Sequence, residues 1–175
     1  MKKEEIVAKL EEKHQELLLL ISTHPDENWE KGPIDKWSFG QHILHLLDSL
    51  KLLNKALSYP KFILKYKFGI ANRGLRSYDE IGQRYEEKLA ENLDRTRQFN
   101  SKLTKPSLQQ KKEITNKLLK QKERLQKLTL KWNDVDLDSL LIPHPLMGRM
   151  PVREIIMWTA HHTEHHTRIL KENYL

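Results

Sequence analysis

Histidine is the residue type through which this sequence could do chemistry, and it is concentrated in two segments. Four of the nine histidines lie in HHTEHH at residues 161–166, and two more, His42 and His45, lie in GQHILHLL. His162 and His166 are four residues apart, which on a helix places both imidazoles on one face, one turn from each other. Two histidine ligands of a single metal ion need this spacing.

His161 and His165 have the same spacing, so hydrophobic periodicity must distinguish the two pairs. At ~100° per residue counted from Ile155, His162 and His166 fall within about 20° of the centre of the apolar face. The other pair turns toward the solvent side. Burying two neutral imidazoles is costly unless they are hydrogen-bonded or bind a metal. The pattern therefore favours His162 and His166 as ligands of one metal ion.

A third ligand could come from the earlier histidine segment. Periodicity places His42 nearer than His45 to the apolar centre of its helix, by a margin that a small helix rotation would erase. Two other interpretations stay open at this point. The histidines could be ordinary core and surface residues with hydrogen-bond partners, or they could form a surface patch that scavenges metal or responds to pH.

The spacing of apolar residues and helix-start signals predicts helices over about residues 3–22, 39–57, 77–103, 107–132 and 151–173. Ser38 with Gln41 forms a capping-box pattern at the start of the second, and Pro151 suits the first turn of the last. Residues 60–76 and 133–150 are expected to be loops, the second with at most one helical turn, and no strand is expected. We expect an all-α antiparallel four-helix bundle with long crossover loops, forming a single domain over residues 1–175.

Composition excludes several classes of function. With 175 residues and no cysteine, the chain has no disulfide, zinc–thiolate site or cysteine nucleophile. No apolar run is long enough for a leader or a membrane span, so we expect a soluble, cytoplasmic protein. The formal net charge of +7 comes from residues 102–131, which suggests nucleic-acid binding as an alternative. Arg124 is the only arginine in that segment and no aromatic residue occurs before Trp132, which is unlike sequence-reading surfaces.

Two longer strings bear a resemblance to a known family. WSFGQHILHLLDS and, about a hundred residues later, HPLMGRMPVREIIMWTAHHTEHH resemble the DinB/YfiT-like family of metal-binding four-helix bundles. In that family a Trp-Ser/Thr start to the second helix precedes a ligand histidine eight residues on, and the last helix supplies a His-x-x-x-His pair. Counted from Trp37 the resemblance implies His45, with His162 and His166, as the metal ligands, and His42 remains the alternative. It covers about residues 29–170 and is weak between 62 and 103.

The resemblance also implies a chemistry. Three neutral imidazoles leave the charge of a divalent ion such as zinc or nickel uncompensated, with at least one open position, as in catalytic sites. The ion could lower the pKa of a bound water toward ~7 or hold a thiolate from a cosubstrate.

Family members include enzymes acting on low-molecular-weight thiols such as bacillithiol and mycothiol, and others are catalogued as metal-dependent hydrolases. We therefore expect a metal-dependent transferase or hydrolase acting on a small electrophile. The nucleophile would be a metal-bound water or thiol, and Glu164 and His165 are weaker catalytic candidates. Three tryptophans, Trp37, Trp132 and Trp158, could wall a pocket. A non-catalytic metal-binding bundle with a role in stress response is the alternative, and pairing into a homodimer is expected from the family.

Overall fold

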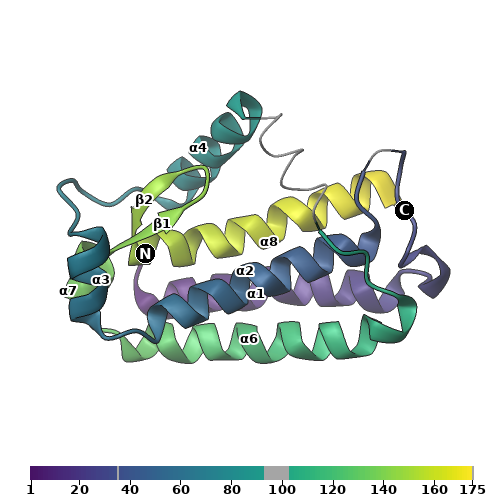
Figure 1. The fold of residues 1–175 in the computed structure, drawn as a ribbon, viewed down its shortest axis with the longest axis horizontal. Helices are drawn as coiled ribbons and strands as arrows, with labels where there is room; N and C mark the ends of the chain where they lie inside the picture. Colours follow the sequence, from purple (N-terminus) through teal and green to yellow (C-terminus); the bar gives the residue numbers. More distant parts are fainter. Residues whose placement is uncertain (35, 93–102, 175) are drawn as a thin grey trace.

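Four long helices lie side by side and make up about half of the structure (Figure 1). The structure is a computed structural model that describes residues 1–34, 36–92 and 103–174. The long helices are α1 (Lys3–Thr23), α2 (Phe39–Leu57), α6 (Lys111–Lys131) and α8 (Val152–Tyr174). α2 packs mainly on α6, and α1 packs mainly on α8. The chain is therefore mostly helical, as the sequence predicted.

The predicted helix starts follow from local hydrogen bonding. The Ser38 hydroxyl accepts the Gln41 N–H at 3.3 Å, and the Gln41 side chain accepts the Ser38 N–H at 2.8 Å, so α2 begins with a capping box. Ser77 starts α4 (Tyr78–Glu91) with the same arrangement. A 3-10 turn, η2 (Leu108–Gln110), leads into α6, and another, η1 (Asp26–Asn28), follows α1. α4 ends at Glu91, and the rest of the helix predicted to residue 103 lies mostly outside the described residues.

One predicted loop is partly helical. Residues 60–76 contain α3 (Lys61–Phe68), which begins directly after Pro60. Leu64 is its buried anchor, whereas Phe62 and Tyr66 are 72% and 90% exposed. Because these apolar side chains point to solvent, they hide the periodicity that would have identified the helix.

The segment before α8 also differs from the prediction. Residues 133–150 contain α7 (Asp134–Ser139) and an antiparallel hairpin of β1 (Leu141–His144) and β2 (Gly148–Pro151). Each strand has four residues, too few to show a useful alternation, so the expectation of no strand was wrong. Gly148 has φ 74°, a turn conformation that glycine adopts without strain. Pro151 ends β2, and α8 begins one residue later.

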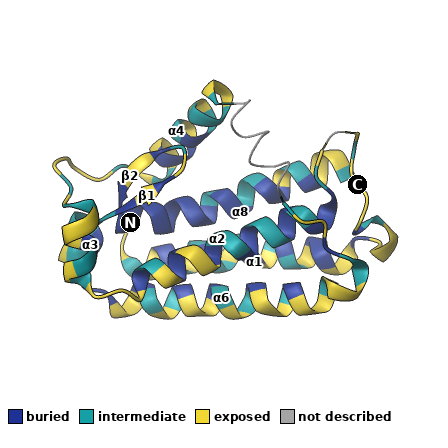
Figure 2. Ribbon diagram, in the orientation of Figure 1, coloured by how far each residue is buried: buried dark blue, intermediate teal, exposed yellow. Residues whose placement is uncertain are grey.

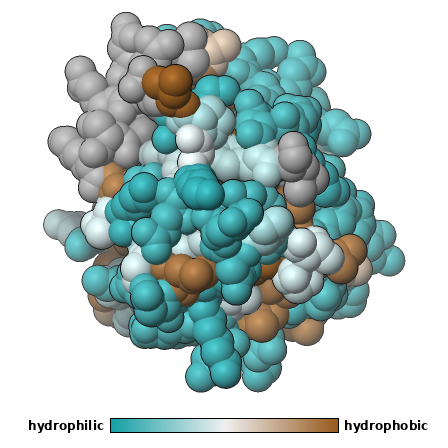
Figure 3. All heavy atoms as spheres, turned by 90° about the vertical axis from the view of Figure 1, so that its right-hand side faces the viewer, coloured by the Kyte–Doolittle hydropathy of each residue, from teal (hydrophilic) through white to brown (hydrophobic). Residues whose placement is uncertain are grey.

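The buried hydrophobic residues form one cluster, to which the long helices and the shorter elements beside them contribute. Figure 2 marks the buried stretches of these elements in dark blue. Figure 3 shows the end of the molecule that carries the C-terminus, where hydrophobic side chains are interspersed with hydrophilic ones. Among the described residues, every helix is too short or too polar to cross a membrane.

The N-terminal part of α8 anchors the segment that connects α3 to α4. The Glu154 side chain has no exposed surface, and its carboxylate accepts hydrogen bonds from both terminal nitrogens of Arg73 at 2.6 and 2.7 Å. It also accepts the backbone N–H of Arg76 at 2.8 Å. Burial works to raise the pKa of Glu154, but the bonds from Arg73 and Arg76 outweigh it and lower the pKa. Glu154 is therefore ionised, and it fixes where α4 approaches α8.

Replacing Glu154 by Gln is expected to lower the free energy of unfolding by about 2–3 kcal/mol. Breaking a buried pair costs about 3–5 kcal/mol when the surviving charge is fully buried. Arg73 and Arg76 are 32% and 29% exposed, so water solvates part of their charge and the loss is smaller. Urea denaturation at pH 7.5 measures the change, with the exposed Glu123→Gln as the matched control. Equal stabilities of the two variants would show that Glu154 is not an anchor.

Candidate metal centre

Three histidines from two helices bring one ring nitrogen each to a common point. His45 comes from α2, and His162 and His166 come from successive turns of α8. The Nε2 atom of His162 lies 3.0 Å from Nε2 of His45 and 3.0 Å from Nε2 of His166. The three side chains form the one group of at least three His, Cys, Asp or Glu residues, within the described part of the chain, that could hold a metal ion.

Burial keeps these imidazoles neutral. His162 and His166 are 2% and 6% exposed, and burial holds the pKa of each well below the ordinary value of 6.5, with neighbouring histidines adding to the effect. Burial also lowers the pKa of His45 to about 4, and that side chain is only partly covered. At neutral pH each ring therefore keeps a lone pair that a metal ion can accept.

The arrangement fits a cation better than hydrogen bonds among the rings. The Nε2 atom of His162 contacts two other ring nitrogens, but it has either one N–H or one lone pair, so it can form only one good hydrogen bond. Its Nδ1 atom is buried with no hydrogen-bond partner among the described residues. A cation bound by one lone pair from each ring would satisfy all three nitrogens together. Zn–N bonds of ~2.0–2.1 Å at tetrahedral angles place ligand nitrogens about 3.3 Å apart, so small ring shifts would suffice.

Aromatic rings cover the cluster. The Trp158 indole stacks on His162 with centroids 4.4 Å apart, and Trp37 lies 5.0 Å from His45 and 6.0 Å from His166. Of the three tryptophans predicted to wall a pocket, these two contact the imidazoles. Trp132 does not; it lies at the end of α6, under the ammonium group of Lys61.

Tyr85 and His144 complete this wall, and neither was predicted from the sequence. The ring of Tyr85 lies 5.9 Å from His162, and His144 lies 4.2 Å from Trp158. His144 also accepts the backbone N–H groups of Leu146 and Met147 through Nδ1, which closes the hairpin turn. The HPLMG string offered a signal for His144, whereas nothing in the sequence pointed to Tyr85.

His42 lies behind the cluster. Its Nδ1 contacts Nδ1 of His166 at 2.9 Å, on the side of that ring opposite the Nε2 that meets His162. It is absent from the group whose ligand atoms all lie within 4.8 Å of one another. The structure thus places His45, rather than His42, with the pair from α8, in agreement with the register counted from Trp37.

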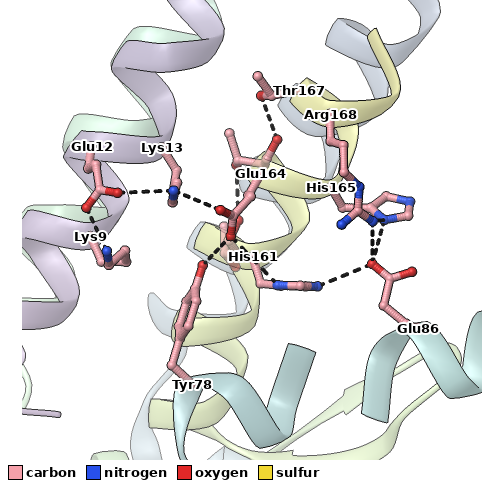
Figure 4. Close-up of polar contacts among 12 residues, drawn as sticks. Lys9, Glu12, Lys13, Tyr78, Glu86, His161, Glu164, His165, Thr167 and Arg168 are labelled. Atoms are coloured by element: carbon pink, nitrogen blue, oxygen red, sulfur yellow. Dashed lines mark hydrogen bonds and ion pairs between the residues drawn. The ribbon is translucent and has the colours of Figure 1, made fainter. Parts of the chain in front are cut away.

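Figure 4 shows the two weaker catalytic candidates, Glu164 and His165, on the side of α8 that faces Lys13, Tyr78 and Glu86. The Glu164 carboxylate pairs with Lys13 at 2.8 Å and accepts the Tyr78 hydroxyl at 3.2 Å. Burial works to raise its pKa, but the bonds from Lys13 and Tyr78 lower it, so Glu164 is ionised and already engaged. His165 contacts Glu86 through Nδ1 at 2.9 Å, and its ring centroid is 5.2 Å from that of His166.

A groove of about 610 Å³ lies along this side of α8, next to α4. Tyr78, Gly82, Glu86, His161 and Arg168 are among its lining residues, and His45, His162 and His166 are not. Gly82 allows the close approach of the two helices, because a Cβ there would lie 2.8 Å from Cε1 of His161. This groove and the three-histidine cluster are therefore separate features.

The chain belongs to the DinB superfamily, whose family model matches residues 9–170. No curated protein and no solved structure matches it. Superfamily membership and the three-histidine cluster both fit a metal-binding protein.

Proposed function

We propose that this protein is a metal-dependent enzyme of the DinB/YfiT-like class that holds one divalent ion, zinc or nickel, through His45, His162 and His166. The observation that carries the proposal is the convergence on one point of three Nε2 atoms from neutral imidazoles, the two from α8 buried and that of His45 partly covered. Imidazole ligands suit both metals. Within the proposal, α1, α2, α6 and α8 form the antiparallel four-helix bundle of that class.

The proposed reaction is attack by a low-molecular-weight thiol or by water on a small electrophile. A divalent ion held by neutral imidazoles acts there as a Lewis acid, which makes a thiol or water more acidic. The side chains around the cluster control its access to water. Trp37 and Trp158 exclude water from the sides of the cluster, and the partly covered His45 leaves its side more accessible than those of the two α8 ligands.

The wild-type chain, purified without an affinity tag, is expected to take up one zinc or nickel ion per chain. Equilibrium dialysis followed by elemental analysis measures the stoichiometry. An ion present at about 100 times its Kd should stabilise the fold by ~2.7 kcal/mol, which thermal unfolding detects. Failure to take up a stoichiometric divalent ion would refute the proposal.

Catalysis is tested separately on the loaded protein. Consumption of a small electrophile with a low-molecular-weight thiol, and hydrolysis of an activated ester, are compared between loaded and chelator-stripped samples. We expect metal-dependent turnover in one of the two assays. Metal uptake without turnover in either would favour the non-catalytic metal-binding bundle.

A further inference from the structure

A chain of hydrogen bonds leads from the metal centre to the backbone before α2. Nδ1 of His166 lies 2.9 Å from Nδ1 of His42, and Nε2 of His42 lies 3.1 Å from the hydroxyl of Tyr174. That hydroxyl donates to the backbone carbonyl of Trp37 at 2.5 Å. The two imidazoles are each 6% exposed, so the central bond lies in the interior.

The backbone carbonyl at the end of this series of hydrogen bonds determines which atom donates in each of them. A backbone carbonyl only accepts, so the Tyr174 hydroxyl must donate to Trp37. The hydroxyl oxygen then accepts an N–H from Nε2 of His42, which leaves a lone pair on Nδ1 of His42. That lone pair must accept the N–H of Nδ1 of His166. In a neutral ring the Nε2 of His166 then carries its lone pair, and it faces His162.

We infer that His42 and Tyr174 are positioning residues for the metal centre. Through the carbonyl of Trp37 they hold His166 in the tautomer whose Nε2 lone pair points toward His45 and His162. The inference rests on the proposed function, since it concerns one of the proposed ligands. Metal-ligating histidines commonly donate their second N–H to a carboxylate, a carbonyl or a water, and loss of that acceptor costs ~10–100-fold in metal affinity. Here the acceptor is another histidine.

This role for His42 differs from that of a metal ligand. A ligand would direct a lone pair at the ion, whereas the Nδ1 lone pair of His42 is directed at the far side of His166 and its Nε2 is directed at Tyr174. Position 42 therefore needs a hydrogen-bond acceptor where Nδ1 of His42 lies. It does not need a ring that binds metal. Asn provides an oxygen near that position, and Leu fills the space without one.

The first experiment determines tautomers by NMR of the full chain with ¹⁵N-labelled histidine at pH 8. In the zinc-loaded protein we expect His42 to be neutral and protonated at Nε2. In the chelator-stripped protein we expect His166 to be protonated at Nδ1. This measurement tests the series of hydrogen bonds in the absence of a metal. A His166 protonated at Nε2 in the stripped wild type would overturn the inference.

The second experiment compares zinc affinities by competition with a chromophoric chelator. His42→Leu is expected to bind zinc ~10–100-fold more weakly, and His42→Asn should stay within about threefold of wild type because its oxygen replaces the acceptor. Tyr174→Phe should weaken binding less than His42→Leu, because it frees the tautomer of His42 without removing that ring. Thermal unfolding of the stripped variants confirms that each is folded.

The outcomes separate the two proposals. If the wild type takes up no ion, the proposed function fails. If the wild type binds zinc and a folded His42→Leu binds it equally tightly, only the positioning role fails. If His42→Asn loses as much affinity as His42→Leu, the ring itself is needed, and the assignment of His42 as a hydrogen-bond acceptor is wrong.

Discussion

Substitution of His162 by Ala is expected to abolish stoichiometric zinc or nickel binding at micromolar metal. The Nε2 of His162 is the one that contacts both other ring nitrogens, so its loss leaves His45 and His166 without the ligand between them. Four-ligand structural zinc sites bind with about 10–16 kcal/mol, or roughly 3 kcal/mol per ligand. Removing one ligand should therefore weaken binding on the order of 100-fold or more.

His161→Ala is the matched control, because it removes the neighbouring imidazole from the same helix. His161 faces Glu86, with Nε2 3.6 Å from the carboxylate, and it is outside the three-histidine group. Titration calorimetry should give an affinity for His161→Ala within about threefold of wild type, since its ring contacts none of the three Nε2 atoms. Circular dichroism and urea denaturation verify that both variants are folded. Equal losses in the two variants would contradict the ligand assignment.

The metal-free protein is expected to lose stability steeply as the pH falls from about 6.5 toward 4. Burial lowers the pKa of His14, His45 and His144 to about 4 and that of His42 to about 3, and it holds those of His162 and His166 well below 6.5. In the unfolded chain the same groups titrate near ~6.5. Below that pH the unfolded state binds more protons, so its free energy falls relative to the folded state. The stabilisation is present in full above the histidine pKa of the unfolded chain. It is lost as the pH drops toward the lower pKa values of the folded state.

The size of this effect rivals the total stability of a domain. Each such histidine contributes up to about 1.4 kcal/mol per pH unit. Four of these six histidines, each at half of that maximum, already give about 3 kcal/mol per unit. Native domains have about 5–15 kcal/mol in all, so half-unfolding near pH 5 is expected. Carboxylates change the stability at lower pH than these histidines do. Glu11, for example, has its pKa lowered to about 2, chiefly by hydrogen bonds from Gln15 and Lys122.

Urea denaturation at a series of pH values measures the proton uptake on unfolding. His14→Leu serves as a control, because His14 is 1% exposed and is not among the three clustered histidines. The leucine fills the same space without titrating. The number of protons taken up on unfolding between pH 6.5 and 5 should therefore fall by about one. If the wild type takes up fewer than one proton on unfolding over that interval, the buried histidines do not control acid unfolding.

The long helices and the α8 histidine pair could be predicted from sequence because both depend on local periodicity. The capping pattern at Ser38 located the start of α2, and the spacing of His162 and His166 identified two of the three clustered side chains. The choice between His42 and His45 could not be made from periodicity, since it depends on how α2 is rotated against α8. The resemblance counted from Trp37 pointed to His45, which the structure places with the other two.

The features that the sequence did not reveal are short elements without a clear pattern and contacts between distant segments. α3 exposes apolar side chains, and the hairpin of residues 141–151 is too short to show a pattern. Tyr174 reaches His42 across 132 residues of chain, so no local motif announces it.

Most of the basic segment was predicted to lie in the helix of residues 107–132, and α6 now shows how part of its charge is used. Lys111 pairs with Asp26 at 2.5 Å, Lys122 pairs with Glu11 at 2.6 Å, and Lys117 pairs with Glu113. Lys122 is 5% exposed and joins α6 to α1. Ion pairs with acidic residues of the same chain thus account for some of the lysines that made nucleic-acid binding an alternative.

The contact between His45 and His162 spans 117 positions of the sequence. An ion held by both would act as a reversible cross-link that encloses two thirds of the polypeptide in one loop. Cross-links that close long loops remove the most conformational freedom from an opened chain. Fraying of α8 away from α2 would then require the ion to be released first, so the rate of metal dissociation would limit how often a protease finds the C-terminal helix detached.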